Sequence, residues 1–211
     1  MQNPPFSRLR RVSGRERPGG AASLASDPEI VAGLMRGESW AAEHLYDRVQ
    51  PFVERTLRRV LRSSGPEYDD LVQMSFERII RVLSERSLGG ACDLPAWSSA
   101  VSAHIALDAL RRRVRERRLF QAEGDYEPGI SHEPNPERTA SARVEVDRVH
   151  AVLGRMRPKH AEAVLLHDVL GHDLAEIAVM TGASPAAAQS RLVRGRKELL
   201  RRAKATKGQG R

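Results

Sequence analysis

Positive side chains gather in two segments of this 211-residue chain. Residues 108–118 hold six arginines against two carboxylates, and residues 184–211 hold nine basic residues against Glu198 alone. Between them, residues 119–140 hold five acids and one arginine. Because guanidinium and ammonium groups neutralise phosphate, two basic patches suit a protein that touches one long polyanion at two places. Cations also stabilise helix C-termini, so either patch alone fits a solvated helix end about equally well.

The second basic segment follows a pattern of helix, tight turn and helix. Asp173 can cap the first helix, and Gly182 can supply the positive φ of a sharp turn. Ser184 and Pro185 then open the second helix. A helical hairpin at a protein interface shares this pattern, but the charge favours DNA. We expect base or phosphate contacts from six residues of the second helix: Gln189, Ser190, Arg191, Arg194, Arg196 and Lys197.

Apolar residues recur with helical spacing along most of the chain, and no window alternates as a strand would. Pro51 should kink its helix or split it in two. The predicted helices cover residues 27–36, 38–61, 67–86, 95–117, 139–156, 159–170, 173–180 and 185–204.

We therefore expect an all-α fold of two small helical domains joined by a flexible acidic linker. The domains would span residues 27–117 and 141–204, with the linker at 118–140. A disordered basic arm at residues 1–26 and a tail at 205–211 would flank them.

Catalytic and metal chemistry finds little support in the sequence. The single cysteine, Cys92, excludes an internal disulfide framework and falls in a predicted loop, where it could be an exposed thiol. His160, His167 and His172 lack the cysteine or paired carboxylate that would complete a metal site. No phosphate-cradling glycine loop is present. We expect neither an enzyme nor a cofactor.

Hydropathy predicts neither a membrane span nor a secretory signal. No run of 18 apolar residues occurs, and the arginine-rich N-terminus has no apolar segment after it. We expect a soluble cytoplasmic protein.

Three stretches, in this order, carry recognisable motifs. Residues 68–79 read YDDLVQMSFERI. Residues 94–97 read LPAW and lead into HIALDALRRR at 104–113, and residues 176–197 contain EIA and then SRLVRGRK. Together they resemble RNA polymerase sigma factors of the extracytoplasmic-function (ECF) type, in the sigma-70 superfamily. His104 stands where that family has asparagine, and Met74 stands where it has an acid.

The resemblance implies a sigma region 2 bundle that binds core RNA polymerase and opens the −10 element, and a region 4 helix-turn-helix that reads the −35 element. Its polymerase-binding residues would lie on an exposed helix edge, with Val72 and Phe76 pointing inward; they are Asp70, Leu71, Gln73 and Met74. Its −10 contacts would come from His104, Asp108, Arg111, Arg112 and Arg115. Asp108 could hold one arginine in place while the others meet phosphates.

The predicted function is that of an alternative sigma factor that directs promoter-specific transcription initiation. Its expected partners are core RNA polymerase, promoter DNA and an anti-sigma factor, with no membrane contact. The alternatives are a helix-turn-helix regulator that never enters the polymerase, and a non-catalytic helical adaptor. The regulator would leave the segment from Asp70 to Phe76 without a purpose.

Overall fold

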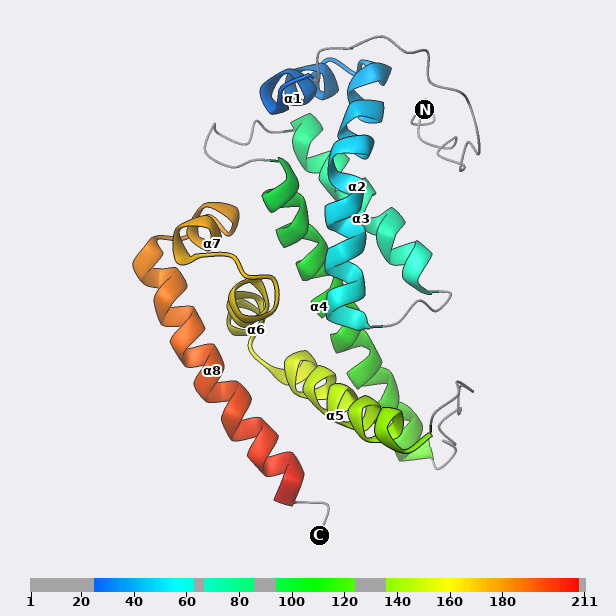
Figure 1. Cartoon of the computed structure of the whole chain (residues 1–211), viewed down its shortest axis with the longest axis vertical. Coiled ribbons are helices and arrows are strands. Elements are labelled where there is room, and N and C mark those ends of the chain that lie inside the picture. Colours follow the sequence, from blue (N-terminus) through cyan, green and yellow to red (C-terminus); the bar gives the residue numbers. More distant parts are fainter. Residues whose placement is uncertain (1–24, 63–66, 86–93, 124–135, 209–211) are drawn as a thin grey trace.

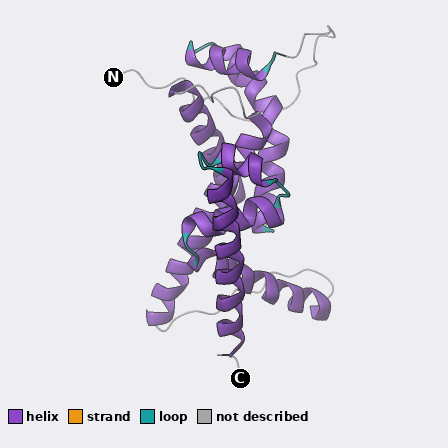
Figure 2. Ribbon diagram, turned by 90° about the vertical axis from the view of Figure 1, so that its left-hand side faces the viewer, coloured by secondary structure: helices purple, strands orange, loops and turns teal. Residues whose placement is uncertain are grey.

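The computed structural model describes residues 25–62, 67–85, 94–123 and 136–208. Every regular element in these ranges is a helix, which confirms the all-α prediction (Figure 2). Most of the predicted basic arm, Cys92 and residues 124–135 of the predicted linker lie outside the described residues. Within the described ranges, no helix combines the length and the hydropathy that a membrane span requires.

Four helices pack into the N-terminal bundle around a core of aliphatic side chains (Figure 1). They are α1 (Asp27–Met35), α2 (Ser39–Leu61), α3 (Glu67–Glu85) and α4 (Leu94–Glu123). Ser26 caps α1, because its backbone N–H donates to the Glu29 carboxylate at 2.7 Å. The Asp27 carboxylate instead accepts from the Leu94 N–H at 2.8 Å and pairs with Arg48 at 2.9 Å, which fastens α1 to the start of α4 and to α2.

Helix α2 runs without interruption through Pro51, so the predicted split is wrong. Pro51 is exposed, while Val49 and Val53 on either side of it are fully buried. A proline removes one backbone hydrogen bond, and burial of its neighbours compensates for that loss.

The C-terminal half contains α5 (Pro136–Arg155), α6 (Pro158–Val164), the π-helix η1 (Leu165–Val169), α7 (Leu174–Met180) and α8 (Pro185–Gly208). The sequence predicted one helix over residues 159–170, but its second half is a π-turn. There the Leu170 N–H donates to the Leu165 carbonyl, five residues back, at 3.0 Å. The wider turn leaves both Leu165 and Leu166 buried.

Helix α5 lies against α4 and joins the two halves of the molecule (Figure 1). A Cβ atom built on Gly154 would lie 3.0 Å from the Leu110 carbonyl oxygen and 2.9 Å from Val114, so the two helices approach closely there. The ring of His150 adds a bond from α5 to α2, since its Nε2 donates to the Val60 carbonyl at 2.7 Å. Helix α4 also extends to Glu123, six residues past the predicted end of its helix at Arg117.

Candidate nucleic-acid and polymerase interfaces

The predicted helix-turn-helix is formed by α7 and α8. Asp173 caps α7 through a capping box with Glu176, with the two hydrogen bonds at 2.8 and 2.9 Å. Gly182 adopts φ +60 in the turn. The Ser184 hydroxyl then accepts from the Ala187 N–H at 3.2 Å at the start of α8. The turn residues singled out in the sequence therefore do what their types predicted.

One side of α8 packs on the protein and the other is open. Ala188 and Leu192 are buried. Gly195 touches α6 so closely that an added Cβ would lie 2.7 Å from the His160 carbonyl oxygen. The open side includes the polar and basic residues Gln189, Arg194 and Lys197, while Ser190 and Arg191 are half-buried at its border. Small side chains at the start of the helix and cations along it suit entry into a major groove.

Arg196 differs from its neighbours, because its guanidinium turns toward η1. Its Nε donates to Asp168 Oδ2 at 3.0 Å, and its Nη2 donates to the other carboxylate oxygen. The hydrogen bonds from Arg196 hold the pKa of the Asp168 carboxyl below its ordinary value, against a smaller effect of burial. This bidentate pair directs Arg196 away from the phosphate contact that the sequence predicted. No local pattern in the sequence indicates this pair, because Asp168 and Arg196 are 28 residues apart.

Glu198 is the single acid of the second basic segment, and it is buried on the inner side of α8. Its carboxylate accepts from the His160 ring at 2.8 Å, from Arg202 at 3.0 Å and from the Arg157 N–H at 3.4 Å. Burial alone would raise the pKa of Glu198, but these hydrogen bonds outweigh burial and lower it. Sequence reasoning missed this role, although a lone acid among nine cations was a signal.

On α4, the predicted −10 residues lie along one edge, but they are not equally accessible. Asp108 accepts from Arg111 at 2.6 Å, so the expected carboxylate–arginine pair is present. The Arg111 side chain is only 14% exposed, and its Nε and Nη2 atoms have no hydrogen-bond partner. Arg111 is therefore held inside the protein in this arrangement. His104 lies 3.5 Å from Asp108 and 3.9 Å from Glu162 of α6.

Arg112 and Arg115 are the exposed cations of that edge. Arg112 lies 3.9 Å from Glu116, at the limit of an ion pair, and Arg115 pairs with no described carboxylate. Arg113 points elsewhere and donates to Glu67 of α3 at 2.8 Å, which lowers the pKa of Glu67. Arg112 and Arg115 thus remain the side chains most available to a phosphate.

Three of the four residues predicted to form an exposed polymerase-binding edge on α3 are exposed, and one is buried. Asp70, Gln73 and Met74 are exposed, and Met74 keeps 46% of its surface. Leu71 is 2% exposed and belongs to the core, because it falls one turn before the buried Ser75. Val72, expected to point inward, is only half-buried.

The three histidines weighed as metal ligands sit apart, each beside its own carboxylate. His160 contacts Glu198, His167 contacts Asp168 at 2.9 Å, and His172 lies 3.4 Å from Glu176. Among the residues whose positions are given, no three metal-ligating side chains come together.

Comparison with known families matches both halves of this architecture. The family "Sigma-70 region 2" matches residues 45–116, which include most of α2 and all of α3, and "Sigma-70, region 4" matches residues 147–199, from α5 into α8. CarQ, an RNA polymerase sigma factor of Myxococcus xanthus, is 32% identical over 163 residues, which are 77% of this chain and 89% of CarQ. The chain belongs to the sigma-70 family of RNA polymerase sigma factors.

Further relatives are RNA polymerase sigma factors too, and one of them is named as a member of the ECF group. SigE, an ECF RNA polymerase sigma factor of Mycolicibacterium smegmatis, is 30% identical over 166 residues; the match covers 77% of this chain and 63% of SigE. CnrH of Cupriavidus metallidurans is 34% identical over 154 residues, or 68% of this chain and 78% of CnrH. A solved structure of CnrH with the cytosolic domain of CnrY has a TM-score of 0.49 at 20% identity, over 86% of this chain and 99% of that one.

As a sigma factor, the chain is a transcription initiation factor that works with core RNA polymerase and promoter DNA, and not an enzyme. Helices α1–α4 contain its region 2, and α5–α8 contain its region 4.

Proposed function

We propose that this sigma factor binds core RNA polymerase through the exposed edge of α3 formed by Asp70, Gln73 and Met74. An apolar methionine flanked by polar groups is the composition of a small protein interface with a polar rim. We place this contact in the cytoplasm, where the polymerase acts.

The proposed DNA contacts divide between two helices. On α4 they come from His104, Asp108, Arg112 and Arg115 at the −10 element, with Arg111 joining them if its bond to Asp108 opens. On α8 they come from Gln189, Ser190, Arg191, Arg194 and Lys197 at the −35 element. The observation that carries this assignment is the open polar side of α8, which leaves Gln189 and Arg194 free to meet base edges.

A regulatory partner of the anti-sigma class is part of the proposal. CnrH, which is 34% identical to the matched part of this chain, has been solved with the cytosolic domain of CnrY. We propose that a comparable protein holds this sigma factor away from the polymerase until it is needed.

Run-off transcription with purified core polymerase and a genomic DNA library tests the function directly. Transcripts from defined start sites should appear only when this chain is added. DNA retardation without transcripts would favour the regulator that never enters the polymerase. The absence of both transcripts and DNA retardation would favour the adaptor.

Surface variants separate the two interfaces in the same assay. Asp70→Arg or Gln73→Ala should weaken capture by core polymerase without altering the DNA contacts of α8. Gln189→Ala or Arg194→Ala should relax the preference at one promoter base pair by about 1–3 kcal/mol. Equal losses in both readouts would show that the surfaces are misassigned.

A further inference from the structure

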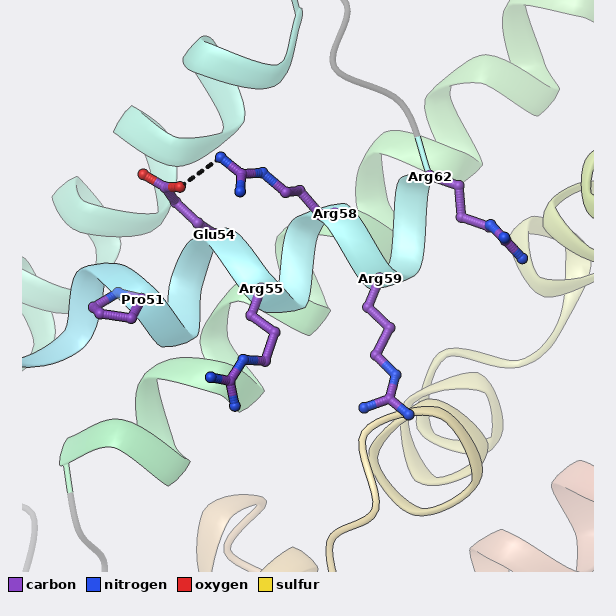
Figure 3. A pocket seen from close by; sticks show the side chains of 6 residues that line it. All are labelled: Pro51, Glu54, Arg55, Arg58, Arg59 and Arg62. Carbon is purple, nitrogen blue, oxygen red and sulfur yellow. Dashed lines mark hydrogen bonds and ion pairs between the residues drawn. The ribbon is translucent and has the colours of Figure 1, made fainter.

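The C-terminal half of α2 carries a row of arginines that neither promoter site includes. Arg55, Arg58, Arg59 and Arg62, with Pro51 and Glu54, line an open hollow of about 790 Å³ (Figure 3). Arg58 is occupied, because it donates to Glu54 at 2.7 Å and lies 5.6 Å from the Tyr68 ring. Arg55, Arg59 and Arg62 are exposed and form no ion pair with any described carboxylate, although the Arg55 guanidinium lies 5.6 Å from the Phe52 ring. We call these three residues the α2 arginine face.

The spacing of the α2 arginine face matches a repeating anion. Arg55 and Arg59 stand one turn apart on one side of α2, about 6 Å along its axis, and Arg62 follows at the end of the helix. Phosphates of one DNA strand follow each other at about 3.4 Å along the duplex axis, so Arg55 and Arg59 can meet two phosphates and Arg62 can meet another. Figure 3 shows Arg55 and Arg59 pointing to the same side, away from the Glu54–Arg58 pair.

Arg62 stands at the end of α2 in an unusual backbone conformation. Arg62 ends α2 in the left-handed region at φ 50, ψ 26, and its N–H donates to the Arg58 carbonyl at 2.9 Å. It is the one non-glycine residue with positive φ in the described ranges. Glycine would take this conformation without strain, so the turn itself gives no reason for an arginine.

Stabilisation of the helix dipole accounts for only part of this row. Arg58 and Arg59 lie in the last turn of α2, where cations are favourable. Arg55 lies before that turn, and the dipole effect falls off within it.

The C-terminal end of α2 lies beside the basic stretch of α4, because α2 packs along α4. The first two residues of α3 connect them, since Glu67 pairs with Arg113 of α4 at 2.8 Å and Tyr68 lies under Arg58 of α2. Both basic groups therefore belong to the same end of the region 2 bundle.

We propose that the α2 arginine face binds the phosphate backbone of the promoter duplex, as an extension of the DNA surface on α4. The proposal rests on the proposed DNA contacts of region 2. It assigns no base recognition to α2, because guanidinium groups in a row on an exposed helix can follow a backbone without reading sequence.

The test uses the full chain bound to core polymerase and a duplex promoter on which the wild-type chain directs run-off transcription. The binding constant for the promoter falls as salt concentration rises, and the steepness of this log–log plot counts phosphate contacts. Arg55→Gln/Arg59→Gln should make the plot less steep by about 0.9 for each arginine lost. The matched control is Arg78→Gln/Arg81→Gln on α3, which removes the same charge from exposed positions outside the hollow and should leave the slope unchanged. Equal slopes for the wild-type chain and the α2 variant would overturn the proposal, as would loss of core polymerase binding, since the face would then contact protein. If the wild-type chain gives no transcripts, the proposed function fails instead.

Arg62→Gly distinguishes a DNA contact from a structural role. Glycine relieves the left-handed strain, so the variant should melt at the same temperature as the wild-type chain or higher. Its promoter affinity should nevertheless fall, with a salt slope lower by about 0.9. A variant of unchanged affinity and slope would show that Arg62 serves only the helix end.

Discussion

Region 2 and region 4 are both helical, but they combine apolar and polar contacts in different proportions. Region 2 is built on large aliphatic side chains that are fully buried, including Leu45, Leu57, Ile79 and Leu107. Region 4 is smaller, and α8 reaches α6 through the close approach at Gly195 and through a buried carboxylate, Glu198. A small module that must leave one helix face open has less apolar area to bury, so short contacts and polar bonds carry more of its stability.

The Glu198 network shows how the polar solution works. A buried carboxylate is costly unless its lone pairs are satisfied, and three donors from α6, α8 and the segment before α6 satisfy it here. Hydrogen bonds also depend on direction more than apolar contacts do. We infer that directional hydrogen bonds fix the orientation of α8 in region 4, whereas close packing of apolar side chains fixes the helices of region 2.

Leu107→Ala should give the largest effect, and it tests the apolar side of this comparison. The side chain is 0% exposed, so truncation should cost about 3 kcal/mol in the free energy of unfolding. Urea unfolding followed by tryptophan fluorescence reports on region 2, because both Trp40 and Trp97 lie there. Met35→Ala, at a position of α1 that is 52% exposed, is the control and should cost less than about 0.5 kcal/mol. A cost below about 1 kcal/mol for Leu107→Ala would contradict a tightly packed region 2 core.

Gly195→Ala should be next in size and should act on region 4. The new methyl group would lie 2.7 Å from the His160 carbonyl oxygen, which is backbone and cannot swing aside, so we expect a loss of about 2 kcal/mol. Hydrogen exchange should accelerate in α6 and α8 while the tryptophan signal of region 2 stays unchanged. Val193→Ala, on the exposed side of the same helix, is the control. Equal protection in both variants would show that α8 can shift to accommodate the methyl group.

The Asp168–Arg196 pair should give a smaller effect, because surface ion pairs contribute about 1 kcal/mol or less. Its clearer readout is salt dependence. If Arg196 braces η1, Arg196→Gln should leave the salt slope of promoter binding unchanged, and Asp168→Asn should release Arg196 toward phosphate and raise the slope by up to about 0.9. Arg194→Gln, on the open side of α8, should lower the slope by about 0.9. A lower slope for Arg196→Gln would restore the phosphate contact predicted from sequence.

His150 should give the smallest effect, a few-fold change in docking of α5 on α2 with pH. Burial lowers the pKa of His150 from its ordinary 6.5, and the bond to the Val60 carbonyl and the nearby Asp147 oppose this only in part; Arg113 and Arg117 add to the lowering. The docked form therefore binds its proton less readily than the undocked form, so docking is complete above about pH 6.5 and weakens as pH falls below it. The radius of gyration from small-angle X-ray scattering should increase between pH 7.5 and 5.5, and His150→Gln should remove most of that change.

Sequence reasoning predicted the elements of both regions well, because amphipathic spacing and turn chemistry are local properties. The cap at Asp173 and the turn at Gly182 are examples. It erred where a single position depends on the packed surroundings. The motif predicts an exposed Leu71, but the packed bundle buries it, and Pro51 alone predicts a break that burial of Val49 and Val53 on either side prevents.

The site residues were predictable by type but not by partner. Exposed Gln189, Arg194 and Arg115 follow from the polar stripes of their helices. The engagement of Arg196 by Asp168, and of Glu198 by His160, depends on how distant helices meet, which a single sequence does not specify. The π-turn at η1 was missed for a related reason, since its wider ring places two consecutive leucines in the core.

Gly154 has a consequence for promoter geometry. While its bare backbone rests against Leu110 of α4, α8 is carried at one fixed offset from the helix proposed to meet the −10 element. If the spacer of a promoter requires a different distance between α8 and α4, the chain can bind both elements only after α5 separates from α4. Because Gly154 has no side chain, α5 and α4 meet closely at this position. The contact between α5 and α4 must therefore separate before the chain can bind the two promoter elements at a different spacing.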